Sequence, residues 1–467
     1  MEENQITNIR LFHTNDIHSH FETWPTIVGL LKSNRASSVM NGEENLTFDI
    51  GDFVDRFHPI SEATLGKGNV ILLNEAGYDA ITIGNNEGIT LSKDQLVSLY
   101  EEANFDVLIG NLTITNNLSN ISKPYQLFEK AGVKIGVIGL TVSYPVFYHS
   151  LGWAIQDPFE RLSEILPIVK DQADIIIILS HLGIKDDLLL AEKFEGIDII
   201  LGAHTHHLFP NGEYVGDTLL CGTGKHGNYL GEVLITFNKK TKTIINLKAS
   251  VIDVHQVPIY LQDERTIGLL SNLMRMSEEI LAEPVTFIPS NLPVNWFKNS
   301  PLPNILASAL KQWTNAEISM INAGILLDGL NQGIVTKGQI HRICPHPINP
   351  CIVELSGKEL LEVINRGEDK ELVHKQMKGF GFRGKVIGMM VYDGVTILNR
   401  QIPKRIVKED VLINNQMLDL NRRYKLGTLD MFTFGHLFQE IYEAKYKKYF
   451  MPEFIRDVLN WSLKFIK

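Results

Sequence analysis

The sequence of 467 residues predicts an α/β protein, and two observations support that fold class. Short aliphatic runs, in which Ile, Val and Leu occupy consecutive positions, recur through the first half and are typical of strands buried on both faces. Stretches compatible with helices separate several of these runs. The runs are 9–12, 46–50, 80–83, 107–109, 133–140, 175–179 and 197–201, and the helical stretches include 25–33, 69–76 and 158–170.

Length, composition and charge exclude several classes of protein. Hydrophobic residues make up 44% of the chain and charged residues 21%, which is typical of globular proteins and not of disordered or fibrous ones. The 44 Lys and Arg against 54 Asp and Glu give a net charge of −10, which disfavours nucleic acid and anionic membranes as partners. The chain is longer than the about 100–200 residues that one core serves, so two domains are expected.

The cysteines and the N-terminus both bear on the cellular compartment. Three cysteines, Cys221, Cys344 and Cys351, are too few for a disulfide framework and suit a reducing environment. Residues 1–5 show no basic leader followed by an apolar stretch. The longest aliphatic run, 175–179, is far shorter than the ~20 residues that span a bilayer. We therefore expect a cytoplasmic protein with no membrane partner.

The character of the sequence changes after the first half. Apolar residues recur at helical spacing between 263 and 283, and Pro284 stops the pattern, which predicts a connecting helix. We expect a first α/β domain over 1–257, the connecting segment over 258–284 and a second α/β domain over 285–467. In the second domain the expected elements are a helix over 304–313, strands over 317–321 and 352–355, a further element over 357–365 and a closing helix near 452–465.

Polar side chains concentrate where the predicted strands stop. Asp16 and His18 follow the first run, and Asp52 follows the second. Ligand sites of α/β sheets lie beyond the carboxyl ends of the strands, so we expect these dispersed residues to converge. The full set comprises Asp16, His18, Asp52, Asn85, His181, His204 and His206.

The donor atoms of this set indicate two adjacent divalent transition-metal ions. Imidazole nitrogens with carboxylate and amide oxygens suit Mn, Fe, Co, Ni or Zn, with Mn or Zn expected first, and do not suit Ca or Mg. Asp52 is the candidate bridge, because each carboxylate oxygen can take one ion. Asp16 and His18 share a face of an extended segment, since they are two residues apart. The same holds for His204 and His206.

Two such ions predict the reaction class. Ions about 3.5–4 Å apart can hold a hydroxide between them and neutralise phosphoryl oxygens, so in-line hydrolysis at phosphorus is the reaction they serve best. A metal-bridged hydroxide attacking phosphorus needs no covalent enzyme intermediate.

A series of short motifs runs in order along residues 14–206. These are Thr14-Asn15-Asp16-Ile17-His18, Gly51-Asp52, Gly84-Asn85-Asn86-Glu87, Gly110-Asn111-Leu112, 132–139, Ser180-His181-Leu182-Gly183 and Gly202-Ala203-His204-Thr205-His206. The series resembles the calcineurin-like metallophosphoesterases, and within them the cytoplasmic bacterial members of the 5′-nucleotidase and 2′,3′-cyclic-nucleotide phosphodiesterase family. The resemblance implies a four-layer αββα sandwich followed by an α/β substrate-recognition domain. It also implies two ligand sets, one of Asp16, His18, Asp52 and His206 and the other of Asp52, Asn85, His181 and His204.

One position departs from the pattern of this family. The family usually has a His that contacts the phosphoryl group, where this chain has Asn86. Asn86 can donate a hydrogen bond to a phosphoryl oxygen, but it cannot deliver a proton at neutral pH. Loss of a general acid typically costs ~10²–10⁴ in rate and matters least for a good leaving group, which favours anhydrides, cyclic diesters or activated phosphates. The histidines that could substitute are His20, His58, His207 and His226.

The second domain resembles the C-terminal half of the family through Asn322-Ala323-Gly324, with Leu327 where the family has a substrate-binding Arg. Family members stack a nucleobase between two aromatic rings, and such stacking is worth roughly 1–3 kcal/mol per base. The nearest equivalents lie in 379–384 and 432–435, where the Phe residues either sandwich a base or belong to the core. The candidate substrate-binding residues are Phe380, Phe382, Arg383, Phe434 and Asn86.

Together these features predict a dimetal-dependent phosphohydrolase whose partner is a small nucleotide or related phosphate ester. Asn86 and Asp52 are the candidate catalytic residues. One open alternative is a hydrolase of nucleotide anhydrides, nucleotide sugars, cyclic nucleotides or sulfur esters. The other is a metal-loaded nucleotide-binding sensor with little turnover. The sequence predicts no particular oligomeric state.

Overall fold

The computed structural model describes residues 5–112, 122–377, 379–398, 405–435 and 437–465. The chain divides into two compact units, Met1–Ser277 and Glu278–Lys467. The predicted connecting segment, 258–284, contains this division. Most of the N-terminal segment from which we expected no leader, residues 1–4, lies outside the described residues.

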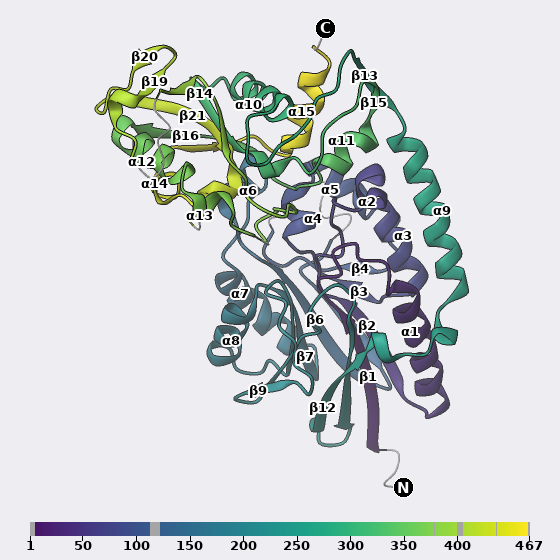
Figure 1. The fold of residues 1–467 in the computed structure, drawn as a ribbon. Coiled ribbons are helices and arrows are strands. Elements are labelled where there is room, and N and C mark those ends of the chain that lie inside the picture. The colour runs from purple at the N-terminus through teal and green to yellow at the C-terminus, as the bar shows by residue number, and fades with distance from the viewer. Residues whose placement is uncertain (1–4, 113–121, 378, 399–404, 436, 466–467) are drawn as a thin grey trace. The chain divides into compact units, whose positions relative to one another are not determined.

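Within the described residues, the first unit contains two six-stranded sheets (Figure 1). In the first sheet β1, β2, β3 and β4 are parallel. On the other side of β1, β11 pairs antiparallel with β1, and β12 pairs antiparallel with β11. In the second sheet β6, β7, β8 and β10 are parallel, with β5 and β9 antiparallel at its edges. The strands of the first sheet are, in spatial order, β12 (Thr243–Asp253), β11 (Tyr229–Asn238), β1 (Ile6–Thr14), β2 (Glu44–Asp49), β3 (Ala80–Ile81) and β4 (Asp106–Val107). Those of the second are β5 (Tyr125–Lys130), β6 (Val133–Thr141), β7 (Ile175–His181), β8 (Ile199–Gly202), β10 (Thr218–Cys221) and β9 (Glu213–Val215).

The two sheets pack face to face, which explains the continuous aliphatic runs. Leu11 and Phe48 of the first sheet belong to one buried cluster with Ile177 and Leu179 of the second. All seven residues of β7 are buried, because its alternate side chains, including Ile178, pack on the opposite face against helices. A strand covered on both faces has no polar alternation.

Helices cover the outer faces of this pair of sheets. Leu162 and Val169 of α7 (Pro158–Lys170) pack with Leu190 of α8 (Ile184–Lys193) on the second sheet. The α7 helix begins at Asp157, whose carboxylate accepts the N–H of Phe159 at 2.9 Å. On the first sheet, α1 (Trp24–Met40) contacts β2 and α3 (Lys67–Ala76). The order is therefore helix, sheet, sheet, helix, and the predicted α/β class and layered architecture are confirmed. The other α-helices of the first unit's described residues are α2 (Pro59–Thr64), α4 (Asn85–Thr90), α5 (Lys93–Leu99) and α6 (Pro145–Ser150), and α9 (Glu264–Leu281) spans the division between the units.

The second unit has its own core around a five-stranded mixed sheet. Ile318 of β14 and Leu426 of β21 are paired in parallel and lie in one cluster with Leu310 of α10. The five strands are, in spatial order, β17 (Met390–Asp393), β14 (Ile318–Asn322), β21 (Arg423–Leu429), β16 (Pro350–Ser356) and β22 (Lys447–Tyr449). Smaller sheets pair β13 (Pro284–Ile288) with β15 (Gly333–Thr336), and β18 (Val395–Ile397) with β19 (Val411–Ile413) and β20 (Gln416–Met417). The helices are α10 (Pro301–Thr314), α11 (Lys337–Ile343), α12 (Gly357–Gly367), α13 (Lys370–Val373), α14 (Gln439–Glu443) and α15 (Ile455–Leu463).

In the part of the chain that the structure describes, no helix combines the length and the apolar character needed to cross a membrane.

Candidate metal centre

The carboxyl ends of parallel strands bring the predicted polar residues together. The loop after β1 bears Asp16 and His18, and the loop after β2 bears Asp52. The two loops are joined by backbone hydrogen bonds, since Asp16 N–H donates to Gly51 O at 3.0 Å and His18 N–H donates to Asp52 O at 2.8 Å. From the second sheet, His181 ends β7, and His204 and His206 follow β8.

Backbone strain is concentrated in these residues. A left-handed backbone costs a residue other than Gly of order 1–3 kcal/mol, and it persists only where the surroundings fix it. Positive φ values place five of the predicted ligands in this region: Asp16 (50°), His18 (50°), Asp52 (51°), His204 (70°) and His206 (58°). The local structure is therefore held in a costly conformation that aims these side chains.

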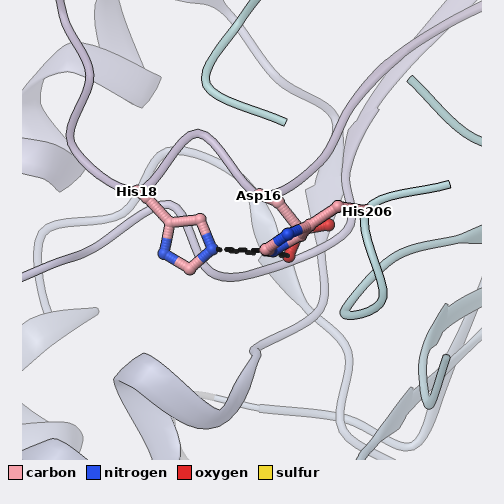
Figure 2. A group of neighbouring side chains, drawn as sticks. All are labelled: Asp16, His18 and His206. Atoms are coloured by element: carbon pink, nitrogen blue, oxygen red, sulfur yellow. Dashed lines mark hydrogen bonds and ion pairs between the residues drawn. The ribbon is translucent and has the colours of Figure 1, made fainter. Parts of the chain in front are cut away.

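Among the residues that the structure describes, two groups of three side chains bring their potential ligand atoms within 4.8 Å of one another. The first is Asp16, His18 and His206, shown in Figure 2, where His206 Nε2 lies 3.5 Å from Asp16 Oδ1. The second is Asp16, Asp52 and His181, where His181 Nε2 lies 3.6 Å from Asp52 Oδ1. His18 Nε2 lies 3.7 Å from Asp52 Oδ2, so Asp52 has one oxygen towards each group.

Two buried atoms at this centre lack a hydrogen-bond partner among the described residues. They are Nε2 of His181 and Oδ1 of Asn85. His181 Nδ1–H donates to the carbonyl oxygen of Ile50 at 2.6 Å, so in the neutral imidazole Nε2 presents its lone pair. An unpaired buried polar atom costs about 1–3 kcal/mol, and a cation would satisfy both atoms. This donor set of imidazoles, carboxylates and an amide fits divalent transition metals.

The charges of the centre are strongly coupled. Burial lowers the pKa of His181, but the carboxylates of Asp52 and Asp16 outweigh it and raise this pKa to about 10. Burial would raise the pKa of Asp52, yet His181, His18 and the N–H of Asn86 hold it below its usual range. The centre therefore concentrates negative charge beside His181, and a divalent cation bound there would compete with a proton for this imidazole.

His204 lies at the edge of the arrangement. It belongs to neither group of three in the described part of the chain. Its Nε2 is 3.0 Å from the hydroxyl of Tyr144, and its ring centroid is 5.3 Å from that of His181. Sequence reasoning missed Tyr144, because it follows β6 in a loop without a motif. The predicted role of His204 as a ligand stays a prediction.

Asn86, the predicted departure from the family, is buried beside the ligands. Its Nδ2 lies 2.9 Å from His18 Nδ1, and its Oδ1 accepts from Asn85 Nδ2 at 3.2 Å. Its backbone N–H donates to Asp52 Oδ1 at 2.7 Å. Asn86 thus contacts side chains from both predicted ligand sets.

Glu87 is a second residue whose structural role was not predicted, since the sequence marks it only as the last residue of Gly84-Asn85-Asn86-Glu87. Its buried carboxylate accepts three backbone N–H groups, from Asp52 at 3.0 Å, from Val54 at 2.8 Å and from Gly84 at 2.8 Å. It therefore ties the loop after β2 to the start of α4.

The candidate substrate residues of the second unit differ in their surroundings. Phe380 is 44% exposed, and its ring stacks on Phe434 with centroids 5.6 Å apart and planes at 28°. Phe382 is 2% exposed and stacks on the buried His346, which favours the core alternative for this residue. Arg383 is partly exposed, and its backbone N–H donates to His346 Nδ1 at 2.8 Å.

The comparisons with known proteins decide the family. Residues 9–208 match the family described as calcineurin-like phosphoesterase, and residues 281–437 match the 5′-nucleotidase C-terminal domain. The chain is 44% identical over 458 residues to the metallophosphoesterase YunD of Bacillus subtilis (strain 168), covering 97% of this chain and 99% of that protein. The chain belongs to the calcineurin-like metallophosphoesterases. The predicted family is thereby confirmed.

More distant relatives agree with this assignment. This metallophosphoesterase is 23% identical over 466 residues to the 5′-nucleotidase of Bos taurus, covering 86% of this chain and 78% of the relative. It shares its fold with the NAD nucleotidase of Haemophilus influenzae, at a TM-score of 0.69 and 16% identity, over 98% of this chain and 96% of that structure. The protein is a phosphoric ester hydrolase from a family that uses divalent metal ions and acts on small nucleotide substrates.

Proposed function

We propose that this metallophosphoesterase is a dimetal-dependent phosphohydrolase of nucleotides. The observation that carries the proposal is the convergence of two groups of ligand atoms that share Asp16, one with His18 and His206 and the other with Asp52 and His181. One ion would be held by Asp16, His18, Asp52 and His206, and the other by Asp52, Asn85, His181 and His204. Mn²⁺ or Zn²⁺ suits these donors.

Two ions held there would activate a water molecule for in-line attack on phosphorus and neutralise the phosphoryl oxygens. Within the chain, Asp52 stays ionised and bridges the two ligand sets. Asn86 supplies amide hydrogens for a phosphoryl oxygen and provides no proton for the leaving group. The loops are held by the hydrogen bonds of Glu87, so the donors are fixed before substrate arrives.

The second unit supplies a surface for the nucleoside. The stacked rings of Phe380 and Phe434 are accessible, and separating them would sandwich a base. Arg383 supplies a cation for a ribose or phosphate oxygen. We assign catalysis to residues 1–257 and recognition of the nucleoside to 285–467. The three cysteines are free buried thiols, which supports a reducing, cytoplasmic environment.

A substrate panel tests the proposal. Purified protein with Mn²⁺ is offered nucleoside monophosphates, cyclic nucleotides, nucleotide anhydrides and a generic aryl phosphate, with Asp52→Asn as the blank. We expect metal-dependent release of phosphate that EDTA abolishes and the variant lacks. Tight nucleotide binding with no hydrolysis of any member of the panel would contradict the proposal.

That result would support the second candidate function, a metal-loaded nucleotide sensor. The observation that favours the sensor is Asn86, a residue without a transferable proton beside the ligands.

A further inference from the structure

Two histidines outside the predicted ligand sets lie beside the candidate metal centre. The rings of His20 and His226 stack with centroids 3.8 Å apart and planes at 31°. The ring of His226 also meets the ring of His18 edge-on, at a centroid distance of 5.9 Å. The backbone N–H of His226 donates to the backbone carbonyl oxygen of Asp16 at 2.8 Å, so the position of His226 is fixed relative to the loop that bears Asp16.

The loop that presents His226, residues 222–227, is built into the centre. The side chain of Asn15 holds it from both sides, since its Nδ2 donates to Gly224 O at 2.8 Å and its Oδ1 accepts from Thr223 N–H at 2.9 Å. His226 has φ 60°, the left-handed conformation also found in five of the predicted ligands. A bulky residue keeps this strain only where its surroundings fix it, and such strain gathers at functional sites.

The surroundings of His226 favour a negatively charged ligand. The rings that contact His226 are the imidazoles of His18 and His20, which carry no negative charge. Lys225 is exposed on the same loop. An oxygen of the exposed Glu22 carboxylate lies 3.8 Å from His20 Nδ1. Neutral imidazole rings still offer N–H donors, so an anion can be bound here whatever their protonation state.

The geometry points to a second phosphate subsite, formed by His20, Lys225 and His226 next to the metal centre. It would hold the second phosphoryl group of a nucleotide anhydride, such as a nucleoside diphosphate, while the terminal group lies at the metal centre. This inference rests on the proposed function and narrows its substrate class.

Cleavage of a phosphate anhydride suits an enzyme that has Asn86 in place of a general acid. A water oxygen joins the terminal phosphorus, the bond from that phosphorus to the bridging oxygen breaks, and its electron pair stays on the nucleoside monophosphate. The excess proton of the water passes to solvent, and the products are orthophosphate and the monophosphate. A phosphate leaving group is a more stable anion than an alkoxide, so its departure depends less on protonation by a general acid. Donors from the subsite would bind the oxygens on which this charge remains.

Calorimetric titration with inorganic pyrophosphate and with orthophosphate tests the subsite without turnover. We compare the Mn²⁺-loaded wild type with His226→Ala, Lys225→Ala and the control His149→Ala, an exposed histidine of α6. The first two variants should each weaken pyrophosphate binding roughly tenfold and change orthophosphate binding by less than about twofold, as expected for loss of a hydrogen bond to a charged group. The control should bind both as the wild type does.

Lys225→Ala keeps the test decisive if the strained position 226 does not tolerate substitution, because Lys225 is exposed. Equal effects on pyrophosphate and orthophosphate, or no effect in Lys225→Ala, would overturn the subsite. A wild type that hydrolyses no phosphate ester would overturn the proposed function instead, and the titrations would still report on the subsite.

Discussion

The carboxylate of Glu87 offers a sharp test of how the metal centre is held. It is 1% exposed and accepts the N–H groups of Asp52, Val54 and Gly84 at 2.8–3.0 Å. Replacement by Gln keeps the shape of the side chain and only one oxygen. In the better orientation the amide retains the bonds to Asp52 and Gly84, and its NH₂ group faces the N–H of Val54.

The magnitude follows from that loss. One charge-assisted hydrogen bond disappears and one buried donor is left unpaired, so Glu87→Gln should lower the free energy of unfolding by about 2–3 kcal/mol. Burial and the neighbouring Asp52 raise the pKa of Glu87 to about 7, and the comparison is therefore made at pH 8, where the wild-type carboxylate is mostly ionised.

Urea unfolding and Mn²⁺ titration provide the assay. The urea midpoint should fall at an unchanged slope, and Mn²⁺ affinity should fall with it, because the loop that bears Asp52 loses an anchor. The matched control is Glu101→Gln, an exposed carboxylate of the same unit, which should leave both quantities unchanged. A loss of stability below about 0.5 kcal/mol, the scale of ordinary surface substitutions, together with unchanged Mn²⁺ affinity, would refute the reasoning.

Three further predictions concern proton delivery, base stacking and pH. Asn86→His should raise kcat/KM for nucleoside monophosphates by ~10²–10⁴ and affect anhydrides much less, as steady-state kinetics on both classes will show. Phe380→Ala should raise KM for nucleotides roughly tenfold through lost stacking and leave KM for an aryl phosphate unchanged. Burial raises the pKa of Asp430 from 3.8 to about 7. Between these two pH values the folded protein keeps a proton that the unfolded chain releases, so the free energy of unfolding falls as pH rises. Asp430→Asn removes this dependence and should be more stable than wild type at pH 8 by about 4 kcal/mol, checked by urea unfolding at pH 5 and pH 8.

The strands were predictable where burial on both faces leaves an uninterrupted aliphatic run. The run 175–179 lies in β7, whose residues are all buried. The run 80–83 became a strand only over Ala80–Ile81, although Ile83 is also buried. Hydrophobic residues indicate burial but not strand pairing, so the sequence does not show at which residue a strand ends and the loop to the site begins.

The site was predictable as far as residue type and strand ends determine it. Asp16, Asp52 and His181 end parallel strands or follow them directly, and the topology of the sheets brings them together. The contact of Tyr144 with His204 and the stacking of His20 on His226 join residues far apart in the chain. Such contacts depend on how loops of the two sheets pack, and no local pattern in the sequence encodes that packing.

The substitution at position 86 and the imidazole pair near position 226 are best understood together. An enzyme without a general acid is slow on a substrate whose leaving group must be protonated, and its rate recovers when the leaving group is a stable anion. A stable anion is bound best by hydrogen-bond donors that carry no negative charge, such as the imidazole of His226 and the ammonium group of Lys225. The carboxylates of Asp52 and Asp55 beside His18 would repel it. The loss of proton delivery at Asn86 and the cluster of donors on the loop 222–227 therefore favour the same kind of bond, one between two phosphoryl groups. An enzyme for monoesters would need a proton donor at position 86 and would not need a second phosphate subsite on the loop 222–227.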